Sequence, residues 1–105
     1  MIASTPSAPY FAVIFTSIRT ERDRGYGETA DKMLTLAQTM EGYLGTESAR
    51  EEVGITVSYW SSLESIKNWK LQADHQEAQQ KGRSEWYSKY KVRICKVERD
   101  YGFTL

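Results

Sequence analysis

The sequence contains little of what metal, redox and disulfide sites are built from. Its 105 residues include one cysteine, Cys95, and one histidine, His75. A single cysteine cannot form a disulfide within the chain, and one histidine without a Cys/His cluster or an Asp-rich loop cannot assemble a usual zinc or calcium site. We therefore expect no metal. We expect Cys95 to be a buried structural thiol, because its neighbours alternate as in a strand.

Long hydrophobic runs and an excess of charge are also absent. No segment approaches the roughly 20 apolar residues of a membrane-spanning helix, and the N-terminus lacks the pattern of a signal peptide. The chain carries 14 basic and 14 acidic residues, a formal net charge of zero, so no overall field favours nucleic acid or an anionic membrane. These features predict a cytoplasmic protein that binds neither nucleic acid nor membranes.

What is present indicates one small domain, since chains of this length rarely divide into two. Residues 1–9 are small and polar and contain both prolines, so we expect an N-terminal arm there and a single domain over residues 10–105. The alternation of apolar residues predicts strands, and steps of three and four predict helices. The expected strands are 10–19, 43–52, 54–60 and 91–103, and the expected helices begin near residues 30 and 62.

The helix ends carry recognisable signals. A stripe of apolar residues defines the first helix: Ala30, Met33, Leu36, Ala37 and Met40. Gly42 is placed to end that helix in a left-handed conformation. Ser61 and Glu64 form a capping-box pattern before Leu63, Ile66 and Trp69. Asp74 and Glu77 resemble a second capping box, which predicts a break near Ala73, after which Ala78, Gly82, Trp86 and Tyr87 continue a looser helical face.

The resulting order, βαββαβ, predicts a ferredoxin-like α+β fold with two helices on one face of a four-stranded antiparallel sheet. The first strand is apolar on both faces, with Tyr10, Ala12 and Ile14 alternating with Phe11, Val13 and Phe15, which predicts a central strand that is covered on both sides. The helices cover only one face. A second copy packed against the other face, in a homodimer, would remove the remaining apolar surface from water.

Several segments resemble the antibiotic biosynthesis monooxygenase superfamily of dimeric α+β barrels. They are a strand and helix over 57–69 that contains Trp60 and Trp69, the run from His75 to Gln79, the pair Trp86 and Tyr87, and the strand segment 92–94. The resemblance extends from Tyr10 to Phe103. It implies either a cofactor-independent oxidation of an aromatic compound, with molecular oxygen as co-substrate, or haem degradation.

The haem-degrading branch uses a helix tryptophan, a histidine ligand and an asparagine on the first strand. Trp69 matches the tryptophan. The histidine would fall near Gln79, four residues after His75, and the first strand offers Phe15, Thr16 and Ser17 in place of asparagine. These departures disfavour haem degradation.

The candidate site residues have structural alternatives. Trp69 either packs in the core or lines a cavity for a planar substrate, and Trp60 is expected in the core or a dimer interface. Trp86 or Tyr87 is placed to close the mouth of that cavity. Arg93 either pairs with Glu47 or Glu51, across the sheet or the dimer, or anchors an anionic substrate.

His75 is the natural acceptor of a phenol proton, because its ordinary pKa lies near neutrality, and Asn68 is a second polar candidate beside Trp69. Their structural alternatives are a surface histidine and a solvated asparagine. We therefore predict a monooxygenase that uses no cofactor and acts on a small aromatic or quinol-like compound. The alternative is a non-catalytic protein, of the ligand-binding or stress-response kind, that holds a small hydrophobic ligand.

Overall fold

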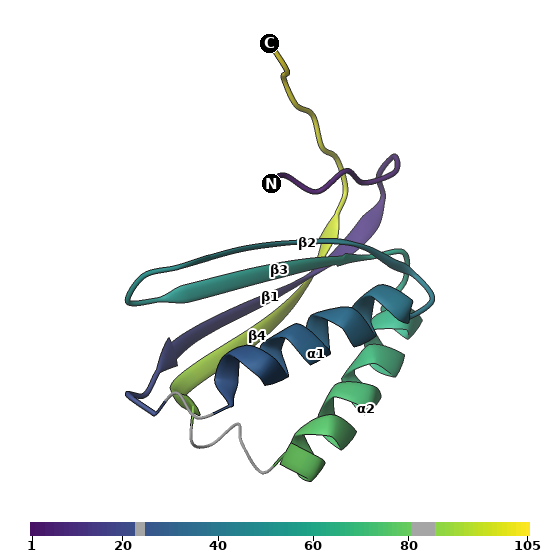
Figure 1. Cartoon of the computed structure of the whole chain (residues 1–105). Coiled ribbons are helices and arrows are strands. Elements are labelled where there is room, and N and C mark those ends of the chain that lie inside the picture. The colour runs from purple at the N-terminus through teal and green to yellow at the C-terminus, as the bar shows by residue number, and fades with distance from the viewer. Residues whose placement is uncertain (23–24, 81–85) are drawn as a thin grey trace.

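The computed structural model describes residues 1–22, 25–80 and 86–105, with the side chains of 76–80 left aside. Its elements are β1 (Tyr10–Arg19), α1 (Tyr26–Thr39), β2 (Tyr43–Arg50), β3 (Gly54–Trp60), α2 (Leu63–Gln80) and β4 (Tyr87–Val97). The strands form one antiparallel sheet in the order β2-β3-β1-β4, and both helices lie on the same side of it (Figure 1). The predicted ferredoxin-like fold is confirmed, while its pairing into a dimer stays a prediction.

The two-faced strand β1 lies in the middle of the sheet, as its apolar pattern predicted. Directly opposite residues of antiparallel strands point to the same face. Phe11 lies opposite Trp60 of β3 and Lys96 of β4, and this row faces the helices. Ile14 lies opposite Val57 and Arg93, and this row faces away from the helices. We call the second surface the open face.

The core between the helices and the sheet is built around Trp60, whose side chain is 0% exposed. Ala37 of α1 and Ile66 of α2 are buried with it, and Phe11 and Val13 pack against this group. The indole Nε1 of Trp60 donates a hydrogen bond to Ser58 Oγ at 2.9 Å. Burial of this large ring therefore leaves its one polar atom satisfied.

Helix α2 differs from prediction at its start and in its middle. Its first turn is capped by Ser62, whose Oγ accepts a hydrogen bond from the Ser65 backbone N–H at 3.1 Å, so Ser61 is not the cap. The predicted break near Ala73 is wrong, because α2 continues to Gln80. The Asp74 carboxylate accepts a hydrogen bond from Lys70 Nζ at 2.8 Å, one turn back, and does not begin a new helix. Gly82 lies outside the described residues, as do the side chains of Glu77 and Ala78.

Other boundaries and burial predictions also need correction. The last strand begins earlier and ends earlier than predicted, at Tyr87 and Val97. Cys95 is exposed and not buried, because it lies on the open face of an edge strand opposite Ala12. Ala30 and Leu63 are likewise exposed. Gly42 does adopt a left-handed conformation (φ 89°), and a Cβ there would lie 2.6 Å from the Ser65 Cβ.

Residues 1–9 lie without regular structure beside the sheet and are tied to it by hydrogen bonds (Figure 1). The Ala3 backbone N–H donates to Glu47 Oε2 at 2.8 Å, and Thr5 Oγ1 donates to the Tyr10 hydroxyl at 3.0 Å. Tyr10 in turn donates to Asp100, which follows β4. Within the described ranges, no helix is both long and apolar enough to cross a bilayer.

The Tyr59–Glu47 pair gives a prediction about alkaline stability. The Tyr59 hydroxyl donates to Glu47 Oε1 at 2.6 Å, and burial together with this bond raises the pKa of Tyr59 to about 12. The folded chain holds the phenol proton more tightly than the unfolded chain. The resulting stabilisation, about 3 kcal/mol, is complete below about pH 10 and is lost as the pH rises through 12.

An ultraviolet titration of tyrosinate absorbance measures this effect. We expect Tyr59→Phe to remove part of the absorbance change above about pH 11, while Tyr101→Phe, at an exposed tail position, leaves that late phase intact. If Tyr59→Phe shows the same absorbance change above about pH 11 as the unchanged protein, other tyrosines account for that change. Tyr10 is one such tyrosine, because its bond to Asp100 also raises its pKa.

Candidate functional site

The helix side of the sheet carries two groups of aromatic side chains. The first contains Trp60, Trp69 and Tyr43. The Trp69 ring stacks on Trp60 with centroids 5.9 Å apart and planes 23° apart, and Tyr43 contacts Trp60 edge-on at 5.6 Å. Trp60 is wholly buried, whereas Trp69 is only partly buried. Core packing therefore accounts for the Trp60 ring and for the part of Trp69 that touches it.

The second group lies at the other end of the helix layer and joins β1, α1 and β4. We call it the β4 aromatic cluster, and its members are Phe15, Tyr26, Trp86, Tyr87 and Tyr90. Phe15 stacks on Tyr90 at 5.4 Å and meets Tyr87 edge-on at the same distance. Tyr26, the first residue of α1, contacts Trp86 at 5.8 Å and Tyr87 at 5.9 Å. The Tyr87 hydroxyl donates to the Tyr26 hydroxyl at 3.2 Å.

Apolar side chains of β4 extend this cluster along the helix side. Phe15 lies opposite Val92 and Val13 lies opposite Ile94, so both β4 residues face the same way as the core. Val92 and Ile94 are nevertheless exposed, as is Tyr90. Edge strand β4 therefore offers an apolar surface, with aromatic rings beside it, on which a flat hydrophobic molecule can pack.

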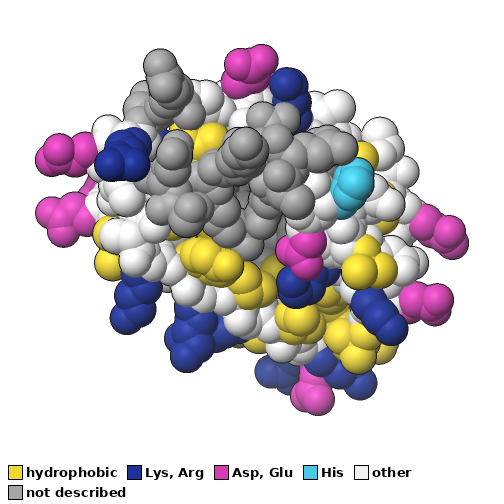
Figure 2. Space-filling view, turned by 90° about the horizontal axis from the view of Figure 1, so that it is seen from below, with side chains coloured by type: hydrophobic (Ala, Val, Ile, Leu, Met, Phe, Trp, Pro, Cys, Tyr) yellow, Lys and Arg dark blue, Asp and Glu magenta, His cyan; other side chains and the backbone are white. Residues whose placement is uncertain are grey.

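The two polar candidates, His75 as proton acceptor and Asn68 as a group that orients substrate or oxygen, are both exposed on α2. Figure 2 shows the single histidine at the molecular surface. Asn68 directly precedes Trp69 and so points about 100° away from it around the helix axis. Within the described part of the chain, no three His, Cys, Asp or Glu side chains lie together as metal ligands.

Arg93 lies on the open face, on the other side of the sheet from Trp69 and the β4 aromatic cluster. One row of the sheet runs Arg93, Ile14, Val57 and Glu47 across all four strands. Three strand spacings separate its ends, about 14 Å. Arg93 therefore cannot form an ion pair with Glu47 within one chain, and the alternative of a contact across a dimer stays a prediction.

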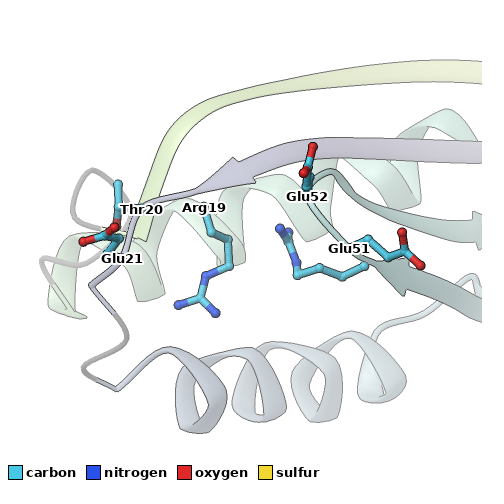
Figure 3. A pocket seen from close by; sticks show the side chains of 6 residues that line it. Arg19, Thr20, Glu21, Glu51 and Glu52 are labelled. Carbon is cyan, nitrogen blue, oxygen red and sulfur yellow. The ribbon is translucent and has the colours of Figure 1, made fainter.

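A hollow at the end of β1 contains two arginines that sequence reasoning missed. Its volume is about 530 Å³, and its lining residues are Arg19, Thr20, Glu21, Arg50, Glu51 and Glu52. Figure 3 shows Arg19 pointing into this hollow from β1. The guanidinium carbon of Arg19 also lies 3.4 Å from the centre of the Tyr26 ring, so the hollow adjoins the β4 aromatic cluster.

Of the two arginines in the hollow, Arg19 could have been identified from the sequence. Phe15, Ser17 and Arg19 alternate on one strand face, which places Arg19 on the same side as an aromatic residue. Arg50 could not be identified as a lining residue from the sequence, because its neighbours become known only with the β2–β3 register.

Comparison with known proteins supports the fold and assigns a family. Residues 9–81 match the family model for antibiotic biosynthesis monooxygenases. The chain is 52% identical over 100 residues to Bacillus subtilis (strain 168) YqjZ, a protein described as uncharacterized, covering 93% of this chain and 88% of that protein.

Solved structures resemble this one in fold. A Shewanella oneidensis protein, SO0527, superposes with a TM-score of 0.71 at 8% identity and covers 94% of this chain and 100% of its own. A Nitrosomonas europaea protein assigned to the antibiotic biosynthesis monooxygenases superposes with a TM-score of 0.65 at 11% identity, covering 87% and 91%. On the strength of the family model and the resemblance of its fold, the chain belongs to the antibiotic biosynthesis monooxygenase family.

Proposed function

We propose that this protein is a monooxygenase that oxidises a small aromatic or quinol-like compound with molecular oxygen and without metal or flavin. The observation that carries the proposal is the aromatic lining of the helix side, in a chain of the monooxygenase family. Aromatic walls favour a planar substrate through offset and edge-on ring contacts.

The reaction needs no external reductant, because the substrate supplies every electron. A hydroxyarene loses its O–H proton and one ring hydrogen, one oxygen atom of O₂ becomes a new carbonyl on the ring, and the other leaves as water. For 1-naphthol the products are 1,4-naphthoquinone and one water molecule. The protein's part is to bind the ring, exclude bulk water and favour the anion that reacts with oxygen.

The proposed substrate wall is Trp69, which Trp60 supports from behind. Trp86 and Tyr87, at the other end of the helix layer, are a separate candidate wall. His75 remains the candidate proton acceptor, and Asn68 remains the candidate group that orients oxygen or the substrate. Because both side chains are exposed, alanine variants test whether either takes part. A loss of rate in His75→Ala assigns the proton to His75, and an unchanged rate assigns it to water. A loss of rate in Asn68→Ala assigns an orienting role to Asn68.

We also propose that the protein is a homodimer and cytoplasmic. Ile14 and Val57 lie centrally on the open face. The segment after β4 extends away from the sheet (Figure 1), and in it Tyr101 and Phe103 are 90% and 86% exposed. A second copy against the open face would cover these apolar side chains. The single cysteine fits a reducing compartment.

Oxygen uptake by chelator-treated protein tests the proposed activity. With a panel of naphthols and anthrones, we expect uptake above the buffer rate and a loss of at least about tenfold in Trp69→Ala, because that substitution removes a ring wall. Lys32→Gln, an exposed change on α1, serves as the control. Uptake that stays at the buffer rate for every compound would refute the proposal.

The exposure of His75 and Asn68 favours a second candidate function, a non-catalytic protein that binds a small hydrophobic ligand. Such a protein would bind the same naphthols without consuming oxygen. Haem degradation receives no support from β1, where Ser17 lies at 1% exposure and accepts a hydrogen bond from Arg50. The position that matches the family histidine, Gln79, lies outside the described side chains.

A further inference from the structure

We propose that a second copy of the chain docks on the open face about a two-fold axis parallel to the strands, so that Arg93 of each copy pairs with the partner's Glu47. The pairing rests on the homodimer of the proposed function. It adds how the two copies are turned against each other and which charged residues determine that choice.

One row of residues crosses the open face from edge to edge. It runs from Arg93 of β4 through Ile14 of β1 and Val57 of β3 to Glu47 of β2. The row therefore has a cation at one end, two apolar side chains in the middle and an anion at the other end. A two-fold dimer presents the same surface from both copies, so this row must be complementary to itself.

An axis parallel to the strands makes the row complementary to itself. The axis lies between β1 and β3, the two middle strands of the sheet. Rotation about it places Ile14 over the partner's Val57 and Arg93 over the partner's Glu47. Each dimer then contains two such apolar contacts and two ion pairs. Stacked sheets lie about 10 Å apart, a gap that an arginine and a glutamate side chain cross from opposite sides.

The twist of the two sheets leaves these pairs within reach. In aligned packing the strands of the two sheets lie within about 30° of each other. The ends of the row lie about 7 Å from the axis, so a turn of about 30° displaces the facing residues by only about 4 Å. Long side chains span that offset. Orthogonal packing would displace the same residues by about 10 Å and would leave both charges without the proposed partner.

Charge disfavours the other aligned arrangement, in which the axis runs across the strands. That axis would place β4 over the partner's β4. The open face of β4 carries Lys89, Lys91 and Arg93, which lie opposite alternate residues of β1. Residues 87–97 contain no aspartate or glutamate. Cations would therefore face cations or uncharged side chains in every register, and like charges that face each other weaken an interface.

Both ends of the row are placed for contact with a second copy. Arg93 is exposed, and among the described residues no carboxylate pairs with it. Glu47 is held by hydrogen bonds from the Tyr59 hydroxyl and the Ala3 backbone N–H, which lower its pKa and keep it charged at neutral pH. A carboxylate offers about four acceptor positions, so two such bonds leave room for a guanidinium.

The N-terminal arm leaves part of the open face free. A Cβ at Gly45 would lie 2.9 Å from the Ala3 Cβ, so the arm covers the face on the Gly45 side of the row. On the other side of the row Ile18 and Ile55 are 42% and 45% exposed. These apolar side chains continue the docking surface toward the end of β1 and would be covered by the partner.

Charge reversal at one end of the row tests the arrangement by sedimentation. At 0.15 M salt, where charges are screened beyond about 8 Å, Arg93→Glu should raise the dissociation constant of the dimer at least about tenfold, because carboxylates then face each other at both ends. Lys91→Glu reverses the same charge on the same face of the same strand. Lys91 would lie over the partner's Ala49, so this control should change the constant by less than about threefold.

A mixture of two variants shows which residues face each other. Arg93→Glu and Glu47→Arg should each fail to dimerise alone at concentrations where an equal mixture forms dimers, because each end of the row in the mixed dimer holds one cation and one anion. The double variant should dimerise within about threefold of the wild type. Circular dichroism confirms that each variant is folded. If loss of the Tyr59 contact unfolds Glu47→Arg, the comparison of Arg93→Glu with Lys91→Glu decides alone.

The outcomes separate this arrangement from the proposed function. A wild-type protein that sediments as single chains would refute the homodimer itself. A wild-type dimer that Arg93→Glu leaves unchanged, or that Lys91→Glu weakens equally, would overturn the arrangement and leave the homodimer standing. Oxygen uptake tests the monooxygenase independently of both results.

Discussion

Trp60→Ala should destabilise the folded chain by about 3 to 5 kcal/mol, the usual cost of removing a large buried ring. The Trp60 side chain is 0% exposed and contacts Trp69 and Tyr43 through their rings. It is also packed with Ala37 and Ile66, so its loss opens a cavity between the sheet and both helices. Because domains of this size have only about 5 to 15 kcal/mol of stability, the variant should be largely or partly unfolded at 37 °C.

Urea denaturation followed by circular dichroism measures this cost. Leu71→Ala is a suitable comparison, because Leu71 lies on α2 but is exposed, and it should change the unfolding free energy by less than about 0.5 kcal/mol. A cost below about 1 kcal/mol for Trp60→Ala would contradict the placement of this ring at the centre of the core.

Val57→Lys should weaken dimerisation by about 150-fold to 5000-fold. Val57 lies on the open face, in the row that also contains Ile14, Arg93 and Glu47. In one chain the new ammonium group reaches solvent beside Glu47, so the fold is retained. In the proposed dimer it would be buried between two sheets, where an unpaired charge costs about 3 to 5 kcal/mol.

Sedimentation equilibrium at micromolar concentration measures the mass. The wild-type protein should sediment at about twice the chain mass of 12.1 kDa, and Val57→Lys should sediment as single chains. Leu34→Lys introduces the same charge at an exposed position of α1 and should remain dimeric. A wild-type protein that sediments as single chains would refute the dimer and leave the apolar open face unexplained.

The order of helices and strands could be predicted from the sequence, because most apolar patterns repeat either every two residues or every three to four residues and not both. The alternation in β1 and β3 and the stripe in α1 each specify one element type, and Gly42 marked a helix end that the structure reproduces. The apolar residues on both faces of β1 also placed this strand in the middle of the sheet.

Predictions from short sequence patterns were wrong where a residue elsewhere in the chain determined the helix end or the burial. Asp74 looked like a cap, but Lys70, one turn earlier, provides its partner and the helix continues. Cys95 alternates like a buried strand residue, yet β4 lies at the sheet edge and its open face is uncovered in the single chain.

The candidate site was predictable in its aromatic content and not in its polar groups. Trp69 lies on the helix side, because its position follows from the helical stripe that it shares with Ile66, whereas Tyr87 was predicted on a helical face and is the first residue of β4. The contribution of Arg50 required the register that brings Gly54 and Ser17 beside it. No pattern within β2 alone contains that information.

Incorporation of isotopically heavy oxygen gas into the product tests the proposed activity most directly. Chelator-treated protein is incubated with 1-naphthol under heavy oxygen, and the quinone is analysed by mass spectrometry. The proposed reaction predicts one heavy oxygen atom in each quinone, at a yield above that of buffer and of the Trp69→Ala variant. Quinone that carries oxygen from water alone, or no quinone above the buffer control, would contradict it.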